Sequence, residues 1–252
     1  MLSNANLRSF AIGLSMIAMT VSGCEKEDHS GHSDSTGHVD FTVTNKVDNE
    51  ILQIGQRNYT TADGDSFQID LLKYFITNFT FVKADGSEHN VGNYDLINSN
   101  NPASYDISLN GIPFGTYTGL RFYLGIDSAR NNDLTNIGDL DPSTGMFWPW
   151  NTGYIFFMAE GSFVGSTGTE TPLRHHYGGT SALVSIDLPM DITISSGHRH
   201  VDLAFNINAL YNTPTPIDLD VDYDRQSFAS DRTWLESMKG NFPGAFSITG
   251  IH

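Results

Sequence analysis

Hydrophobic and polar residues alternate along most of the chain from residue 39 onward. Val39, Phe41 and Val43, for example, are separated by polar residues. Successive side chains of a β-strand point to opposite faces, so this period of two predicts strands with one buried face. The same period recurs in Phe67 to Phe81, Leu120 to Ile126, Val201 to Ile207, Ile217 to Tyr223 and Phe246 to Ile248.

Turn-forming residues separate these stretches, as in Asp85-Gly86 and the Asn/Ser/Pro cluster of residues 98–102. Many short strands with frequent turns are typical of two packed sheets. The sequence therefore predicts an all-β fold: an antiparallel β-sandwich with Greek-key-like connections, long loops and one or two short helices.

Two segments are the helix candidates. In residues 230–239, Trp234 and Met238 give an apolar side, and Gly240 is expected to end the helix. Residues 71–77 are the second candidate. Core packing is the expected role of Trp234.

The N-terminus reads as a lipoprotein signal. Arg8 precedes an apolar run over residues 10–21, and the small residues that follow lead to Cys24, the sole cysteine. The run is too short to span a bilayer, so residues 1–23 are expected to be a cleaved signal peptide. Cys24 is then the lipidated residue, which anchors the protein to the cell envelope, periplasmic or on the outer membrane, without spanning it.

Residues 24–38 are expected to form a flexible tether that carries His29, His32 and His38. Such a tether either collects metal weakly or serves as a soluble spacer. Residues 39–252 would then form one β-sandwich domain.

Acidic residues outnumber basic residues, with 29 Asp and Glu against 13 Lys and Arg and a net charge of −16. Loss of residues 1–23 removes Arg8 alone and makes the charge −17. We therefore expect no nucleic-acid partner, because binding phosphates requires a basic surface. With Cys24 lipidated no thiol remains, which excludes disulfides and zinc–cysteine sites.

Two histidine pairs are candidate metal ligands. His198 and His200 are two residues apart on a predicted strand, so they share a face and could chelate Zn²⁺ or Cu²⁺. An exposed polar strand end is the alternative. His175 and His176 are adjacent, so at most one faces a given site, and a surface pair is the alternative there.

Other motifs give weaker signals. The acidic run of residues 218–224 lacks the Gly and Glu of a calcium loop, so a solvated acidic face is expected. Glu160 alone does not make a catalytic mechanism, and the sequence carries no hydrolase or nucleotide-binding motif. We expect no enzymatic activity, and a metal-dependent hydrolase built on His198 and His200 is the weakest alternative.

Residues 145–154 contain Trp148 and Trp150, two of three tryptophans, on either side of Pro149. This turn-rich context predicts a loop that presents the indole rings. An intact indole offers no lone pair to a metal, so a role in ligation requires oxidation to kynurenine. Met146 could add a thioether, and Asp139 or Asp141 could orient an imidazole.

These residues resemble the MbnP-like copper-binding family. The resemblance rests on five segments in matching order: Leu72 to Asn78, Leu124 to Asn131, Gly138 to Pro142, Gly145 to Tyr154, and His176 to Gly179. It implies a secreted or lipid-anchored β-sandwich that binds copper through histidines and a kynurenine. It also implies a dihaem MauG-type peroxidase as the partner that oxidises the tryptophan.

The resemblance also indicates which residues would bind copper. Trp148 or Trp150 is the implied kynurenine precursor and His176 the implied imidazole ligand. A characterised relative has a histidine two residues after the modified tryptophan, where this chain has Trp150, so His198 or His200 could complete the site. The expected function is copper uptake, storage or delivery at the cell envelope. The alternative is a non-catalytic binding or scaffold domain that stacks sugars on its loop tryptophans.

Overall fold

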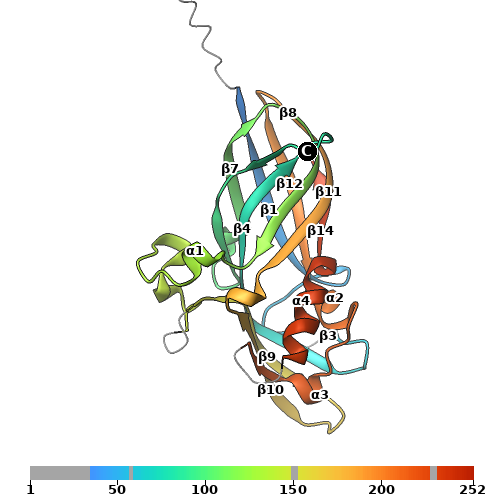
Figure 1. The fold of residues 1–252 in the computed structure, drawn as a ribbon. Coiled ribbons are helices and arrows are strands. Elements are labelled where there is room, and N and C mark those ends of the chain that lie inside the picture. The colour runs from blue at the N-terminus through green and yellow to red at the C-terminus, as the bar shows by residue number, and fades with distance from the viewer. Residues whose placement is uncertain (1–34, 57–58, 149–152, 228–231) are drawn as a thin grey trace, which may run out of the picture. The chain divides into compact units, whose positions relative to one another are not determined.

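The computed structural model describes residues 35–56, 59–148, 153–227 and 232–252. Two β-sheets dominate these residues and face one another (Figure 1). The five-stranded sheet contains β1 (Thr36–Val47), β2 (Glu50–Ile51), β7 (Asp106–Pro113), β12 (His198–Asn206) and β14 (Phe246–Ile251). The nine-stranded sheet contains β3 (Tyr59–Thr60), β4 (Ser66–Val82), β5 (Glu88–Asn90), β6 (Tyr94–Asn98), β8 (Gly115–Leu124), β9 (Ile155–Val164), β10 (Glu170–Gly178), β11 (Val184–Ile194) and β13 (Asp224–Gln226).

Short helices connect the strands. The α-helices are α1 (Ser128–Asn131), α2 (Ile207–Asn212), α3 (Leu219–Asp222) and α4 (Thr233–Ala245), and the 3₁₀ turns are η1 (Pro102–Tyr105), η2 (Gly138–Leu140), η3 (Pro142–Thr144) and η4 (Thr180–Ala182). Helices α2 and α4 pack side by side (Figure 1). Among the described residues, no helix is long and apolar enough to cross a membrane.

The core lies between the two sheets. Aromatic rings meet across it. The ring centroids of Phe41 on β1 and Phe79 on β4 are 4.7 Å apart, and those of Phe205 on β12 and Tyr74 on β4 are 4.9 Å apart. Each of these rings is fully buried, and such pairs stabilise a core beyond the area that they bury. The predicted all-β sandwich is confirmed.

Most strand pairs are antiparallel, but β1 pairs with β12 in parallel, and so does β10 with β13. The sheets are therefore mixed. The parallel register places His38 opposite His198 and Asp40 opposite His200. Strand β1 begins at Thr36, so His38 belongs to the folded domain, and its assignment to the tether is wrong.

Helix α4 confirms the helix predicted from residues 230–239, but it continues past Gly240 to Ala245. Tertiary contacts explain the extension. The buried Asn241 side chain donates to the carbonyls of Leu210 and Thr215 at 2.8 and 2.7 Å, and Phe242 packs against the core. These contacts outweigh the cost of Gly240 within the helix.

Two expected elements are wrong. Residues 71–77 are part of the long strand β4, because β4 is paired on both sides. The alternating stretch from Ile217 to Tyr223 contains helix α3 instead of a strand. The Asp218 carboxylate accepts from the backbone N–H of Asp220 at 3.0 Å, which starts a helix, and Val221 is left 60% exposed.

Candidate metal-binding sites

The described part of the tryptophan-bearing segment runs alongside the start of β9. The backbone N–H of Trp148 donates to the Gly153 carbonyl at 3.0 Å, and the backbone N–H of Ile155 donates to the Met146 carbonyl at 2.8 Å. Met146 and Trp148 both belong to the core, and Trp148 is only 2% exposed. The expected presentation of the rings is therefore wrong for Trp148, and Trp150 lies outside the described residues.

Tyr154 holds this segment in place. Its hydroxyl donates to the Leu140 carbonyl and accepts from the Asn136 amide, and its backbone N–H donates to Asn131 Oδ1 at 2.8 Å. Its ring packs edge-on against Phe75 of β4, with 5.8 Å between centroids. Tyr154 is thus fixed from three parts of the chain.

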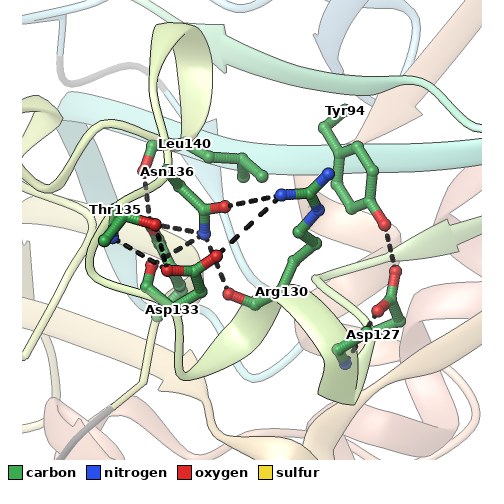
Figure 2. A network of polar contacts seen from close by, with 9 residues as sticks. Tyr94, Asp127, Arg130, Asp133, Thr135, Asn136 and Leu140 are labelled. Carbon is green, nitrogen blue, oxygen red and sulfur yellow. Dashed lines mark hydrogen bonds and ion pairs between the residues drawn. The ribbon is translucent and has the colours of Figure 1, made fainter.

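Asp127 begins the turn-rich segment that leads to Leu140 (Figure 2). Its carboxylate caps α1 by accepting from the Ala129 N–H at 2.9 Å, and it also accepts from the Tyr94 hydroxyl and the Asn78 amide. Partial burial opposes ionisation of Asp127, but these hydrogen bonds outweigh it and lower its pKa.

Asn136 fills the centre of the same turn. Its amide donates to the carbonyls of Arg130 and Asp133 at 2.9 and 2.8 Å, as Figure 2 shows. A cavity of about 550 Å³ lies beside it, lined in part by Tyr94 and Arg130. Because these polar groups bond one another, we assign the network a structural role: it positions Tyr154.

His176 of β10 faces Glu160 of β9. Its Nε2 lies 2.7 Å from Glu160 Oε1, and its side chain is only 13% exposed. Burial lowers the pKa of His176, although Glu160 opposes the shift. The neutral imidazole must carry its proton on Nε2 to bond the carboxylate, which leaves the lone pair on Nδ1.

His175 points the other way, into the core. Its Nε2 lies 2.6 Å from the Asp222 carbonyl and its Nδ1 lies 3.3 Å from the Tyr211 hydroxyl. Full burial lowers its pKa to about 4. His175 is therefore a neutral core residue, and only one histidine of the adjacent pair is placed to serve a site.

The Gly178-Gly179 turn touches the tryptophan-bearing segment. A Cβ on Gly178 would lie 2.4 Å from the Tyr154 carbonyl oxygen, and the Gly179 N–H donates to that oxygen at 3.3 Å. Only glycine permits so close an approach of two backbones. The strand end that carries His176 and the segment that carries Trp148 are thus adjacent.

His198 and His200 share the outer face of β12, as expected, but each bonds a different aspartate. His198 Nε2 lies 2.6 Å from Asp40 Oδ2, whereas His200 Nε2 lies 3.3 Å from Asp202 Oδ1. His252 also bonds Asp202, at 2.9 Å. The two histidines therefore do not share a partner: Asp40 lies on the neighbouring strand β1, whereas Asp202 lies on β12 itself.

His38 joins His198 at Asp40. Its Nε2 lies 2.7 Å from Asp40 Oδ1, and the two imidazole rings meet edge to face with centroids 4.6 Å apart. One ligand atom from each of His38, Asp40 and His198 falls within 4.8 Å of the other two. Among the described residues, this is the group of nitrogen and carboxylate donors gathered closely enough to hold one metal ion.

Sequence reasoning named His38 only as a tether residue that could collect metal weakly, and it did not place His38, Asp40 or His252 beside the histidines of β12. The available signal was the period of two, since His38 and Asp40 share the parity opposite to Val39 and Phe41. What the sequence alone did not indicate was the parallel pairing of β1 with β12.

The remaining acidic candidates have structural partners. Asp139 accepts from the Leu96 N–H at 2.8 Å and so joins η2 to β6, and Asp141 accepts from the Ser143 N–H at 2.8 Å and so caps η3. In the acidic run, Asp222 bonds Arg225 and Asp224 bonds Arg174, both at 2.7 Å. The expectation that this run forms a strand face is wrong, because Leu219–Asp222 forms helix α3. Cys24 lies outside the described residues.

The sequence profile of the MbnP family matches residues 36–228. The chain belongs to the MbnP family. Among solved structures, MbnP from Methylosinus trichosporium matches with a TM-score of 0.53 and 13% identity, over 84% of this chain and 98% of that one. At this identity the likeness shows a common fold. A search of curated proteins finds no match.

The five segments that resemble the MbnP family come together around Tyr154. Phe75 contributes a ring contact, Asn131 and Leu140 contribute hydrogen bonds, and Gly178 contributes the close backbone approach. The family signature thus encodes a frame that joins Trp148 to the His176 strand.

Proposed function

We propose that this MbnP-family protein binds copper at the cell envelope and takes part in copper uptake, storage or delivery without turning over a substrate. The proposal places the copper where the His176 strand end meets the segment of Trp148 and Trp150. Lipidation of Cys24 and residence in the periplasm or at the outer membrane belong to the same proposal, on the strength of the N-terminal sequence.

The observation that carries the proposal is the pairing of His176 Nε2 with Glu160 Oε1 at 2.7 Å. Histidines that bind metals usually donate the other ring N–H to a carboxylate or carbonyl, which fixes the ring and raises its basicity. Glu160 plays that part here, so Nδ1 is the nitrogen offered to copper. Because burial lowers the pKa of His176, its imidazole is neutral at neutral pH, and the neutral form is the one that binds copper.

The tryptophans would complete this site only after oxidation. A kynurenine formed from Trp148 or Trp150 offers an aryl amine and a ketone as donors, and a dihaem peroxidase of the MauG type is the proposed oxidising partner. The burial of Trp148 is compatible with this role, because a donor that lies inside the protein would bind a copper ion shielded from solvent. Met146, equally buried, is a candidate thioether donor.

Sugar binding is the alternative function, and the position of Trp148 argues against it. Stacking on a sugar requires an exposed ring face, whereas Trp148 is 2% exposed. The sugar-binding alternative therefore depends on Trp150 alone.

Copper titration of the mature protein tests the proposal. His176→Ala is expected to remove one equivalent of bound copper, and Glu160→Gln to weaken that equivalent by about 10–100-fold, as for other outer-shell partners. His89→Ala on β5 is the matched histidine control and should leave binding unchanged. Unchanged stoichiometry and affinity in both His176→Ala and Glu160→Gln would refute the proposal.

Intact mass of protein isolated from its native cells tests the oxidation separately. Kynurenine formation removes one carbon and adds one oxygen, and peptide mapping then assigns the change to Trp148 or Trp150. An unmodified mass in native protein that is loaded with copper would restrict the ligands to unmodified side chains.

A further inference from the structure

We propose that His38, Asp40 and His198 form a second metal site, which binds a divalent transition-metal ion such as Zn²⁺ or Cu²⁺. This site lies on the outer face of the five-stranded sheet, whereas His176 lies on the nine-stranded sheet. The two sites share no residue, so this inference goes beyond the copper site proposed above.

The donors are brought together by strand register. His38 and His198 face each other across the parallel β1–β12 pair, and Asp40 is the next residue on the same face of β1. Both imidazoles direct Nε2 at Asp40, at 2.7 Å from Oδ1 and 2.6 Å from Oδ2. Two imidazole nitrogens and a carboxylate oxygen are donors that Zn²⁺ and Cu²⁺ accept.

The donors are also braced from outside, as in established metal centres. Asn110 Oδ1 lies 2.6 Å from His38 Nδ1, so this nitrogen donates its N–H there and Nε2 is the nitrogen turned to the site. The Ser108 hydroxyl donates to Asp40 Oδ1 at 2.5 Å and fixes the carboxylate. Both bracing residues come from β7, the neighbour of β1 on its other side.

A metal ion would replace protons that now separate the donors. Each Nε2 that bonds an Asp40 oxygen does so through an N–H, because a carboxylate only accepts. A bound Zn²⁺ would take the place of these two protons: each imidazole would bind the ion through Nε2 and carry a proton on Nδ1, and a proton in excess of that would go to solvent. The exchange involves no oxidation or reduction.

Room for an incoming ion and its water ligands lies beside the donors. A cavity of about 390 Å³ is lined by His38, Asn110 and His198 and by the Ser196-Gly197 turn. His198 is 59% exposed, while His38 and Asp40 are 33% and 26% exposed. An ion can therefore reach the site from solvent and keep a water ligand, and the protein's net charge of −16 favours its approach.

The neighbouring pair His200 and His252 provides a matched comparison. These histidines bond Asp202 at 3.3 and 2.9 Å, with rings 6.2 Å apart instead of 4.6 Å. Like His38 and His198, they are two partly exposed imidazoles that bond one aspartate. We expect them to bind Zn²⁺ more weakly, because their donors are less closely gathered.

Calorimetric titration of the mature protein with Zn²⁺ tests the site. The wild type is expected to bind one equivalent that His38→Gln and His198→Gln each weaken by at least roughly tenfold, the lower bound for loss of an outer-shell partner. His200→Gln and His176→Ala are expected to bind that equivalent as the wild type does. Circular dichroism confirms that each variant is folded. Bound Zn²⁺ should raise the Tm of the wild type but not that of His38→Gln or His198→Gln.

The results that overturn the inference are distinct from those that overturn the copper proposal. Wild-type protein that binds no Zn²⁺, or a His38→Gln/His198→Gln double variant that binds it as the wild type does, removes the second site. Equal weakening by His200→Gln removes its assignment to these three residues. Loss of copper in His176→Ala with unchanged Zn²⁺ binding leaves both proposals standing. The d–d absorption of wild-type protein loaded with Co²⁺ reports whether nitrogen and oxygen atoms bind the ion, and this measurement requires no variant.

Discussion

His38 and His198 lie opposite each other on two parallel strands, and their imidazoles bond the two oxygens of the same carboxylate, Asp40. A hydrogen-bonded arrangement of this kind forms from residues 160 positions apart in sequence only because β1 and β12 are neighbours. The outer face of the five-stranded sheet thus acquires a chemical character that neither strand has alone.

Asn110 is predicted to tune metal affinity through His38. Asn110→Ala removes the acceptor for His38 Nδ1, so the ring loses its fixed orientation and Zn²⁺ affinity should fall by about 10–100-fold. Asn110→Asp keeps an acceptor at the same place and should restore the affinity. Zn²⁺ titration of both variants makes the comparison. If Asn110→Asp binds as weakly as Asn110→Ala, the effect is only structural.

The sequence predicted the fold class because burial follows the period of two closely. Leu120, Phe122 and Leu124 alternate as expected, and all three are buried. The period does not reveal irregularities. Strand β4 has register shifts between Ile69 and Leu71 and between Thr77 and Thr80, which change the face of the residues that follow.

The sites were predictable only in part, for a related reason. The Trp148 segment and the Gly178 turn were expected to converge, and their backbones do meet at Tyr154. The His38 site depends on a parallel pairing of distant strands, which no local pattern specifies. The burial of Trp148 was missed because Pro149 and the glycines suggested an exposed loop, whereas the Trp148 backbone pairs with Gly153 and its ring packs in the core.

Tyr154→Phe is predicted to destabilise the frame around the tryptophan segment. The substitution leaves the Leu140 carbonyl without its buried donor, which costs about 1–3 kcal/mol, whereas the Asn136 amide keeps the Arg130 and Asp133 carbonyls as acceptors. Urea unfolding measures the loss. Tyr123→Phe on β8 is the control, and a change below about 0.5 kcal/mol is expected for a substitution away from such features. Equal effects in the two variants would show that the hydroxyl of Tyr154 does not support the frame.

Gly178→Ala is predicted to separate the His176 strand end from the Trp148 segment. The new Cβ would lie 2.4 Å from the Tyr154 carbonyl oxygen, so the backbones must move apart, at a cost of about 1–3 kcal/mol. If copper lies between the two segments, its affinity should fall as well. Gly240→Ala is the control: nothing lies near its Cβ and it occupies helix α4, so it should stabilise the protein by about 0.5–1 kcal/mol. Unfolding curves measure the stability of both variants, and copper titration measures their copper affinity.

His175→Gln is predicted to change how stability depends on pH. The unfolded chain binds a proton at His175 near pH 6.5, whereas the folded protein resists it until about pH 4. Folding stability linked to this group is therefore complete above pH 6.5 and is lost as the pH falls toward 4, by about 3 kcal/mol in all. His175→Gln should lose this part of the slope, whatever it costs in stability at neutral pH. Tyr211→Phe is the control, because it removes the hydroxyl near Nδ1 but keeps the imidazole and hence the slope. Unfolding free energies from pH 4 to 7 decide the matter: equal slopes in His175→Gln and wild type would show that His175 is not the buried neutral group described here.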